Sequence, residues 1–151
     1  MSNVWFIGDI HGGHRNVHKF RKQFQSEEDH FQHVKDNFHK VVKKRDKVFF
    51  MGDTAFTLER LQDISTWVCG RKVLICGNHD TDHIPMKVLC EYFDEVYSLY
   101  KWHEFWLSHC PIHPDELRGK VNIHGHVHHA TLNDKRYYNT SLENTGFYPV
   151  D

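Results

Sequence analysis

The sequence lacks the features of a membrane protein and of a strongly charged binding protein. No apolar run approaches the roughly 20 residues that span a bilayer, and the first residues, MSNVWFIGD, show neither a charged leader nor a cleavage site. Lysine plus arginine (19) and aspartate plus glutamate (20) nearly cancel, which leaves a net charge of −1. This balance argues against a disordered charged tail and against capture of long nucleic acid by bulk charge. We therefore expect no membrane partner, and long nucleic acid is not the expected substrate.

Cysteine and proline are also scarce, with four of each in 151 residues. The cysteines contain no C-x-x-C pair, so we expect reduced thiols and a cytoplasmic protein. Because no proline-rich linker and no internal repeat interrupts the chain, residues 1–151 are predicted to form a single domain.

Short apolar runs alternate with amphipathic segments along the chain. Strands are predicted over 4–7, 47–51 and 71–76, with a helix over 27–43 and another that begins after Thr57 and continues to Gly70 as its C-terminal stop. Ser26 and Thr57 are the expected N-caps. The second half predicts a short helix over 85–92, a strand pair formed by 95–99 and 104–108, and strands over 121–124 and 136–139. This order indicates an α/β protein with a mixed sheet, either single or doubled.

Polar side chains follow five of these strands directly. They are Asp9 and His11, Asp53, Asn78 to Asp80, His109, and His126 and His128. The carboxyl ends of strands in α/β sheets are where ligands bind. Histidine, which is the commonest metal ligand, makes up 15 of the 151 residues. We therefore expect these side chains to meet in one site.

The residue types at these positions indicate a metal centre. Carboxylate, imidazole and amide donors without a thiolate suit borderline cations such as Mn²⁺, Fe or Zn²⁺. The pairs Asp9/His11 and His126/His128 are expected to lie on extended backbone, with both members facing the same side. A lone carboxylate such as Asp53 can bridge two metals about 3.5–4 Å apart. Tight turns are expected at the flanking glycines, which are Gly8, Gly52, Gly77 and Gly125.

In their order, these blocks resemble the signature of the calcineurin-like metallophosphoesterase superfamily. The blocks are Asp9-Ile10-His11, Gly52-Asp53, Gly77-Asn78-His79-Asp80, His109 and Gly125-His126-Val127-His128. The wider pattern resembles the short stand-alone bacterial and phage members, in the Asp-x-His-x-x-His-x-Asn block at 9–16 and the close at 139–149. The resemblance implies a two-sheet β-sandwich flanked by α-helices.

The resemblance also implies two divalent metal ions and a division of labour. One ion would be held by Asp9, His11, Asp53 and His128, and the other by Asp53, Asn78, His109 and His126. Mn²⁺ is the favoured ion, with Fe, Ni²⁺ or Zn²⁺ as alternatives. A hydroxide between the metals would attack phosphorus, His79 would protonate the leaving oxygen, and Asp80 would orient the ring of His79. The expected activity is hydrolysis of small phosphodiesters or phosphomonoesters, with the diester slightly favoured because an acid helps a poor leaving group.

One departure from the family pattern narrows the substrate. After Gly52-Asp53 the chain continues Thr54-Ala55-Phe56-Thr57, where the serine/threonine phosphatase branch has Asp-Arg-Gly. The arginine with which that branch grips phosphate has no counterpart here, so we expect neither protein phosphatase activity nor symmetric dinucleoside-polyphosphate hydrolysis.

Further residues are candidates for substrate contact, each with an ordinary structural role as the alternative. They are His14, Arg15, Asn16, His113, Arg118 and Asn139. In contrast, His18, His30, His33 and His39 are expected on helix surfaces without a functional role.

Two other functions stay open from the sequence. A retromer subunit of the superfamily uses the fold as a protein-interaction scaffold after loss of site residues, whereas every ligand position is filled here. A nuclease would need a basic surface that the net charge does not indicate. No apolar stripe predicts an oligomeric state.

Overall fold

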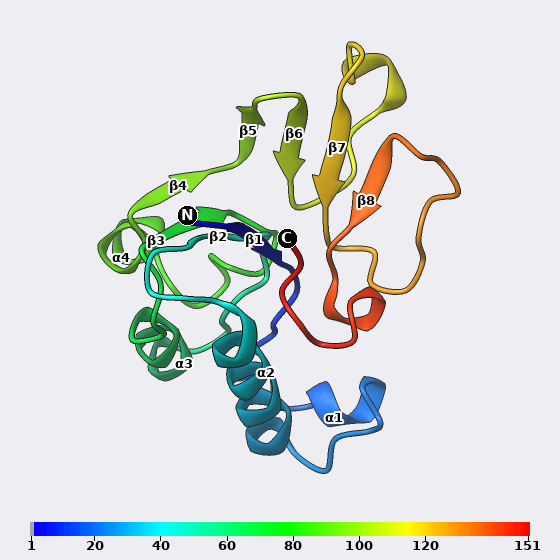
Figure 1. The fold of residues 1–151 in the computed structure, drawn as a ribbon. Helices are drawn as coiled ribbons and strands as arrows, with labels where there is room; N and C mark the ends of the chain where they lie inside the picture. The colour runs from blue at the N-terminus through cyan, green and yellow to red at the C-terminus, as the bar shows by residue number, and fades with distance from the viewer. Residues whose placement is uncertain (1) are drawn as a thin grey trace.

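The computed structural model describes residues 2–151 and shows two four-stranded sheets that pack face to face (Figure 1). The first sheet is entirely parallel, in the order β1 (Val4–Ile7), β2 (Lys47–Phe50), β3 (Arg71–Ile75) and β4 (Glu95–Tyr97). The second contains β5 (Leu99–Trp102), β6 (Phe105–Ser108), β7 (Val121–His124) and β8 (Tyr137–Asn139). Strand β5 runs antiparallel to β6, and the remaining pairs are parallel. The predicted two-sheet α/β fold is confirmed.

The first sheet is buried on both faces, which explains why its strands read as continuous apolar runs. Alternate residues of β2 point to opposite sides: Val48 and Phe50 join the core beneath the helices, whereas Phe49 packs toward the second sheet. Leu107 of β6 and Ile123 of β7 meet Phe49 from across that interface. The inter-sheet core therefore fixes how the strand ends of the two sheets lie relative to each other.

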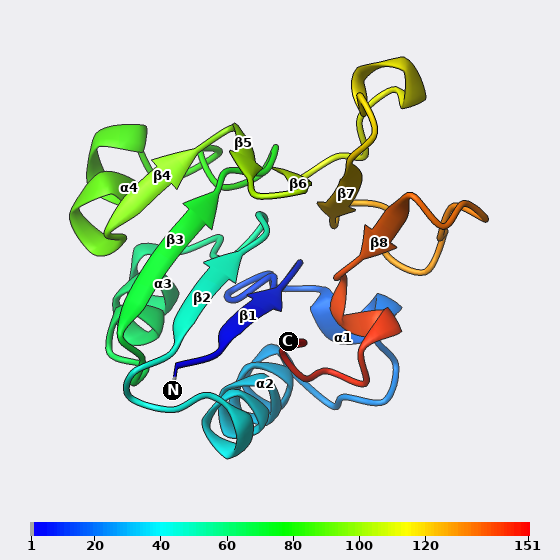
Figure 2. The same ribbon diagram turned by 45° about the horizontal axis from the view of Figure 1, so that its top comes forward.

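Three helices pack on the face of the first sheet that points away from the second sheet (Figure 2). They are α2 (Glu27–Val41), α3 (Leu58–Ser65) and α4 (Met86–Tyr92). The side chains of Ser26 and Thr57 accept hydrogen bonds from backbone N–H groups in the first turns of α2 and α3, as predicted for N-caps. None of the helices in the described part of the chain is long and apolar enough to cross a membrane.

Several predicted element boundaries are wrong. The segment predicted as one strand over 95–99 is divided, because β4 extends the first sheet beside β3 and β5 pairs with β6. An ion pair between Arg71 and Glu95 (2.9 Å) and a bond from the backbone N–H of Lys72 to Asp94 hold β4 in that place. Helix α3 ends at Ser65, well before Gly70, and α2 ends two residues early. The sequence pattern also missed the short elements α1 (Val17–Phe20), η1 (Pro114–Glu116) and η2 (Leu142–Asn144).

His30 is buried, which corrects the prediction that it lies on a helix surface. Its side chain has no exposed area, and its Nε2 lies 2.8 Å from Nη1 of Arg21. Because a guanidinium can only donate hydrogen bonds, His30 must accept with Nε2 and stay neutral. Burial and the charge of Arg21, with a smaller effect of His11, lower the pKa of His30 to about 3, although Glu143 opposes the shift. The histidine is therefore uncharged across the physiological range.

We expect this histidine to make folding stability fall in acid. Between pH 6.5 and about 3, unfolded His30 binds a proton that the folded protein excludes, so the free energy of unfolding falls by about 1.4 kcal/mol for each unit of pH lowered. The variant His30→Gln keeps an acceptor for Arg21 and cannot titrate, so its stability should fall less steeply. Urea unfolding at pH 7, 6 and 5 in chelator measures this, with His33→Gln on the exposed face of α2 as control. Equal slopes for wild type and His30→Gln would contradict the prediction.

Candidate metal centre

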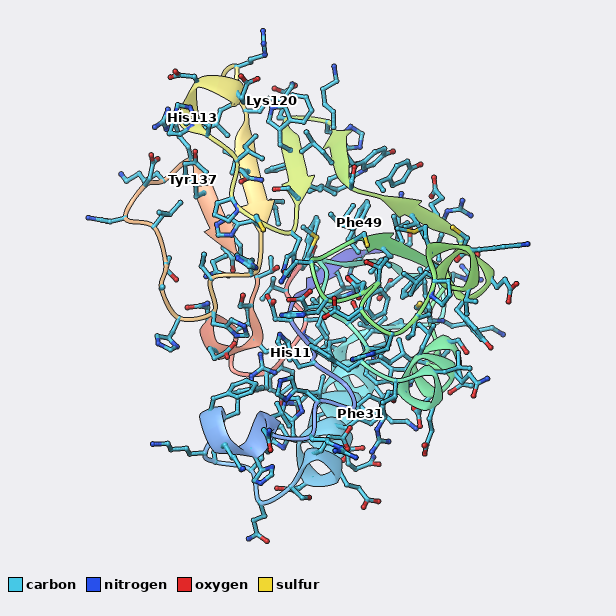
Figure 3. All side chains as sticks on the ribbon, turned by 180° about the vertical axis from the view of Figure 1, so that it is seen from behind. His11, Phe31, Phe49, His113, Lys120 and Tyr137 are labelled. Atoms are coloured by element: carbon cyan, nitrogen blue, oxygen red, sulfur yellow. The ribbon has the colours of Figure 1, made fainter. Side chains whose placement is uncertain are left out.

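The loops after five strands converge at one end of the two sheets. Strand β1 leads to Asp9 and His11, β2 to Asp53, and β3 to the segment 77–80. From the second sheet, β6 leads to His109, and β7 to His126 and His128. Figure 3 shows His11 near the middle of the molecule, between these two groups of loops. The packing of the sheets thus joins residues that are more than 100 positions apart.

A first group of donors is formed by Asp9, His11 and His128, whose ligand atoms lie within 4.8 Å of one another. The Nε2 atom of His11 is 3.7 Å from Oδ1 of Asp9 and 3.9 Å from Oδ2 of Asp53. The side chains of Asp9, Asp53 and His128 lie around His11 and place oxygen and nitrogen donors in the same small space.

A second group contains Asp53, which also faces His11 of the first group. Oδ2 of Asp53 is 3.1 Å from Nε2 of His109, and Nδ1 of His126 is 3.2 Å from both Nε2 of His109 and Oδ1 of Asn78. The Nδ1 atom of His109 is 2.8 Å from the carbonyl oxygen of Met51, which leaves Nε2 free to bind a metal. The structure thus brings all seven predicted ligands into one continuous cluster. Cys110, which the sequence analysis did not consider, stands beside His109 and His126, and burial raises the pKa of its thiol.

The buried polar atoms of this cluster fit a bound cation. Oδ1 of Asp9 and both ring nitrogens of His11 are buried and have no hydrogen-bond partner within residues 2–151. Leaving such atoms unpaired costs about 1–3 kcal/mol each, and coordination would satisfy Oδ1 of Asp9 and one ring nitrogen of His11. Although burial alone would raise the pKa of Asp9, the neighbouring imidazole of His11, the charge of His109 and the hydrogen bond from Ser141 lower it. Asp9 is therefore a carboxylate at neutral pH, the form that binds metals.

Comparison with known proteins agrees with this geometry. The sequence profile of the family described as calcineurin-like phosphoesterase matches residues 2–148. The chain belongs to the calcineurin-like phosphoesterase family. Membership implies metal-dependent hydrolysis of phosphoesters and confirms the resemblance that the motifs predicted.

Relatives of similar length occur in a phage, an archaeon and a bacterium. The chain is 31% identical to the gene 66 protein of Mycobacterium phage L5, over 85% of this chain and 78% of the phage protein. It is 30% identical to an uncharacterized protein of Methanocaldococcus jannaschii, over 99% of this chain and 87% of that protein. A crystal structure of a protein of unknown function from Aquifex aeolicus superposes with a TM-score of 0.76 at 26% identity, over 97% of this chain and 94% of that one.

The backbone at the ligands of this phosphoesterase is not extended, which corrects the prediction. Five ligand residues have φ in the left-handed region: Asp9 (53°), His11 (55°), Asp53 (49°), His126 (71°) and His128 (48°). Such a conformation costs on the order of 1–3 kcal/mol per residue and occurs preferentially at functional sites. Backbone bonds between the loops hold it, including His11 N–H to the carbonyl of Asp53 at 2.9 Å and Asp9 N–H to that of Gly52 at 3.1 Å.

The glycines beside the ligands mostly provide space instead of turn conformations. Of the four predicted to form tight turns, only Gly52 has a left-handed φ (95°). A Cβ atom at Gly77 would lie 2.5 Å from Oδ1 of Asp53, and one at Gly125 would lie 2.5 Å from Oδ2 of Asp9. Gly8 is similarly close to Thr140. At Gly77 and Gly125 the missing Cβ lets the backbone lie close to the carboxylates of Asp53 and Asp9, which are predicted ligands.

Asp80 does not orient the ring of His79, contrary to the prediction. Its carboxylate accepts hydrogen bonds from the backbone N–H groups of Asp53 (2.8 Å), Thr54 (2.9 Å) and Gly77 (2.6 Å), so it ties the loops after β2 and β3 together. The ring partner of His79 is Asp82, whose Oδ2 lies 2.6 Å from Nδ1. Sequence reasoning missed Asp82 because the neighbouring Asp80 fills the family motif.

Two of the predicted substrate contacts lie next to the ligands. His14 and Arg15 line an open pocket together with His79, Phe56, Thr57 and Asp82. The ring centroids of His14 and Phe56 are 5.0 Å apart, and those of Phe56 and His79 are 5.2 Å apart. Asn16 is exposed at the N-cap position of α1, where its side chain forms no capping hydrogen bond.

The other three predicted contacts do not lie in this pocket. His113 caps η1 and is exposed at the far end of the second sheet from His11 (Figure 3). Arg118 points into solvent and pairs with Glu116. Asn139 is buried, and its amide donates to the carbonyl oxygen of His128 at 2.6 Å. Asn139 therefore supports a ligand loop, and the substrate role predicted for these three has no support in their positions.

A second layer of contacts was not predicted. Ser141 Oγ donates to Oδ2 of Asp9 at 2.6 Å, and Nδ1 of His128 lies 2.8 Å from Oε2 of Glu143. Both partners follow β8, the fourth strand of the second sheet. The one available signal was their place after a strand, as for the ligands themselves.

Proposed function

We propose that the protein hydrolyses small phosphodiesters at a two-metal centre, with His79 as the general acid. The observation that carries the proposal is the cluster of seven donors, in which Asp53 lies near both His11 and His109. Asp9, His11, Asp53 and His128 would hold one ion, and Asp53, Asn78, His109 and His126 the other. Two such ions supply a hydroxide nucleophile at neutral pH and offset the charge of the phosphate. Mn²⁺ is the first choice for these nitrogen and oxygen donors, before Fe, Ni²⁺ and Zn²⁺.

His79 is suited to protonate a leaving oxygen. Its Nδ1 bonds to Asp82 at 2.6 Å, which leaves Nε2 as the group that faces substrate. The side chain is 43% exposed and lines the open pocket beside the ligands. A diester is slightly favoured over a monoester, because a general acid in this position serves a poor leaving group, which needs a proton in order to depart.

The pocket that His79 lines supports a small substrate with one apolar group. Phe56 offers an aromatic face, and Arg15 is an exposed cation that forms no ion pair within residues 2–151. We propose that Arg15 and His14 face the phosphate or its leaving group, in place of the arginine that follows Gly-Asp in the protein phosphatases.

The described cysteines are all free, which supports the proposed cytoplasmic location. Because both sheets supply ligands, we propose that residues 1–151 act as a single domain.

The test compares initial rates on bis-p-nitrophenyl phosphate and p-nitrophenyl phosphate, after chelation and again after addition of Mn²⁺. We expect hydrolysis that needs Mn²⁺ and is faster on the diester. Faster hydrolysis of the monoester would overturn the diester preference and leave a phosphomonoesterase. Failure to hydrolyse either ester while Mn²⁺ binds would overturn the enzymatic proposal in favour of a metal-binding scaffold. Cleavage of oligonucleotides alone would favour a nuclease.

A further inference from the structure

We propose that Arg21 and Glu143 are positioning residues for one of the two metal sites, the one formed by Asp9, His11 and His128. The inference rests on the proposed two-metal centre and adds that these two residues strengthen the binding of one of the two ions. Neither residue was among the predicted site residues, although Glu143 lies within the close at 139–149.

Arg21 is buried and Glu143 partly buried, and two hydrogen bonds join them. Arg21 is 1% exposed, and its Nε and Nη2 donate to Oε2 and Oε1 of Glu143, each at 3.0 Å. The residues are 122 positions apart in the sequence. Such a two-point contact fixes the plane of the carboxylate as well as its distance.

Glu143 in turn fixes the ring of His128. Its Oε2 lies 2.8 Å from Nδ1 of His128, so that ring atom donates and Nε2 is the atom left for a metal. A carboxylate behind a ligating histidine sets the tautomer and the direction of the ring.

Arg21 fixes the other two ligands through their backbone. Its Nη2 donates to the carbonyl oxygen of Asp9 at 2.7 Å, and its Nη1 to that of Ile10 at 3.3 Å. These carbonyls belong to the segment in which Asp9 and His11 both have left-handed φ. With His30 as the remaining acceptor, all five donors of the guanidinium are used. One side chain therefore connects the loop after β1 with the residue that orients the ligand after β7.

The second group of donors is supported differently. The ring of His109 is held by the carbonyl of Met51, and the backbone N–H of His126 donates to Oδ2 of Asp9 at 2.9 Å. Neither Asn78 nor His109 nor His126 forms a hydrogen bond to Arg21 or Glu143 in the described structure. Loss of the Arg21–Glu143 pair should therefore weaken one ion and spare the other.

The experiment measures Mn²⁺ binding by calorimetry on the metal-free protein, for wild type, Glu143→Gln and Arg21→Lys. We expect two ions on wild type. In each variant one ion should bind about 10–100-fold more weakly, as for other residues that support a ligand, while the other stays within about twofold. Metal content after gel filtration should fall from two ions to one. Thermal unfolding of the metal-free forms checks that the variants are folded. If Glu143→Gln does not fold, Arg21→Lys, which keeps the positive charge, carries the test.

The matched control is a second bidentate pair, Arg60 with Glu27, at 2.8 and 2.7 Å. Arg60→Lys and Glu27→Gln should leave both Mn²⁺ affinities unchanged, since neither residue bonds to a ligand side chain. If wild type binds two ions and the Arg21 and Glu143 variants bind both as tightly, the positioning role is wrong and the two-metal centre stands. Equal weakening of both ions would also overturn the selectivity. A single ion on wild type would overturn the two-metal centre itself, and this proposal with it.

Discussion

Asp53→Asn is expected to remove metal-dependent phosphoester hydrolysis almost completely. Oδ2 of Asp53 lies 3.1 Å from Nε2 of His109 and 3.9 Å from Nε2 of His11, so it faces both groups of donors. Its other oxygen accepts from the backbone N–H of His79 at 2.8 Å, a bond that asparagine can keep through its amide oxygen. The substitution therefore removes the shared charge with little change of shape. The electrostatic contribution of bound metal is several kcal/mol, which corresponds to a loss of about 10³-fold or more in kcat.

The measurement combines the rate on bis-p-nitrophenyl phosphate with the number of bound Mn²⁺ ions. We expect the variant to bind fewer than two ions at concentrations that saturate wild type. Asp63→Asn is the control. Asp63 lies on α3, forms an ion pair with Lys35, accepts a hydrogen bond from Trp67 and bonds to none of the predicted ligands. Near-native activity of Asp53→Asn with a full complement of metal would show that this carboxylate does not bridge.

The convergence of the predicted ligands at one edge could be foreseen because two simple rules act together. Apolar runs of four or five residues identify buried strands, and polar residues directly after a strand lie at the edge where ligands bind. Asp9, Asp53 and His109 all satisfy both rules. Periodicity does not report the φ angles of the turns that follow, so the left-handed backbone at Asp9 and His128 was not foreseen.

The residues that support the ligands could not be predicted for a different reason. Arg21 and Glu143 meet across 122 positions, and a charged residue in a polar segment carries no sign that folding will bury it. For the same reason His30 on α2 was mistaken for a surface histidine. The choice between Asp80 and Asp82 as partner of His79 depends on how one short loop turns back, which neither residue type nor spacing reveals.

The second large effect is expected from His79→Gln, and its size should depend on the leaving group. The variant should keep both metals, because the predicted ligands keep their own supports. Met51 holds the ring of His109 and Glu143 that of His128, whereas Asp80 accepts from the backbone N–H of Asp53. An acid in this place contributes roughly 10²–10⁴-fold when the leaving group is an alkoxide. p-Nitrophenolate leaves without a proton, so its release should slow by less than about tenfold.

Rates on bis-p-nitrophenyl phosphate and on a dialkyl phosphodiester, from which only an alkoxide can leave, would separate these cases, together with the count of bound Mn²⁺. Asp82→Asn should give the same dependence on the leaving group with a smaller loss, because it removes the negative charge beside Nδ1 and leaves the imidazole in place. His113→Gln, on the exposed tip of the second sheet, is the matched control and should leave all rates unchanged. An equal loss on both classes of leaving group in His79→Gln would mean that the histidine stabilises the phosphate instead of donating a proton. In that case Asp82 should matter equally for every substrate, since its effect would act through the position of the ring alone.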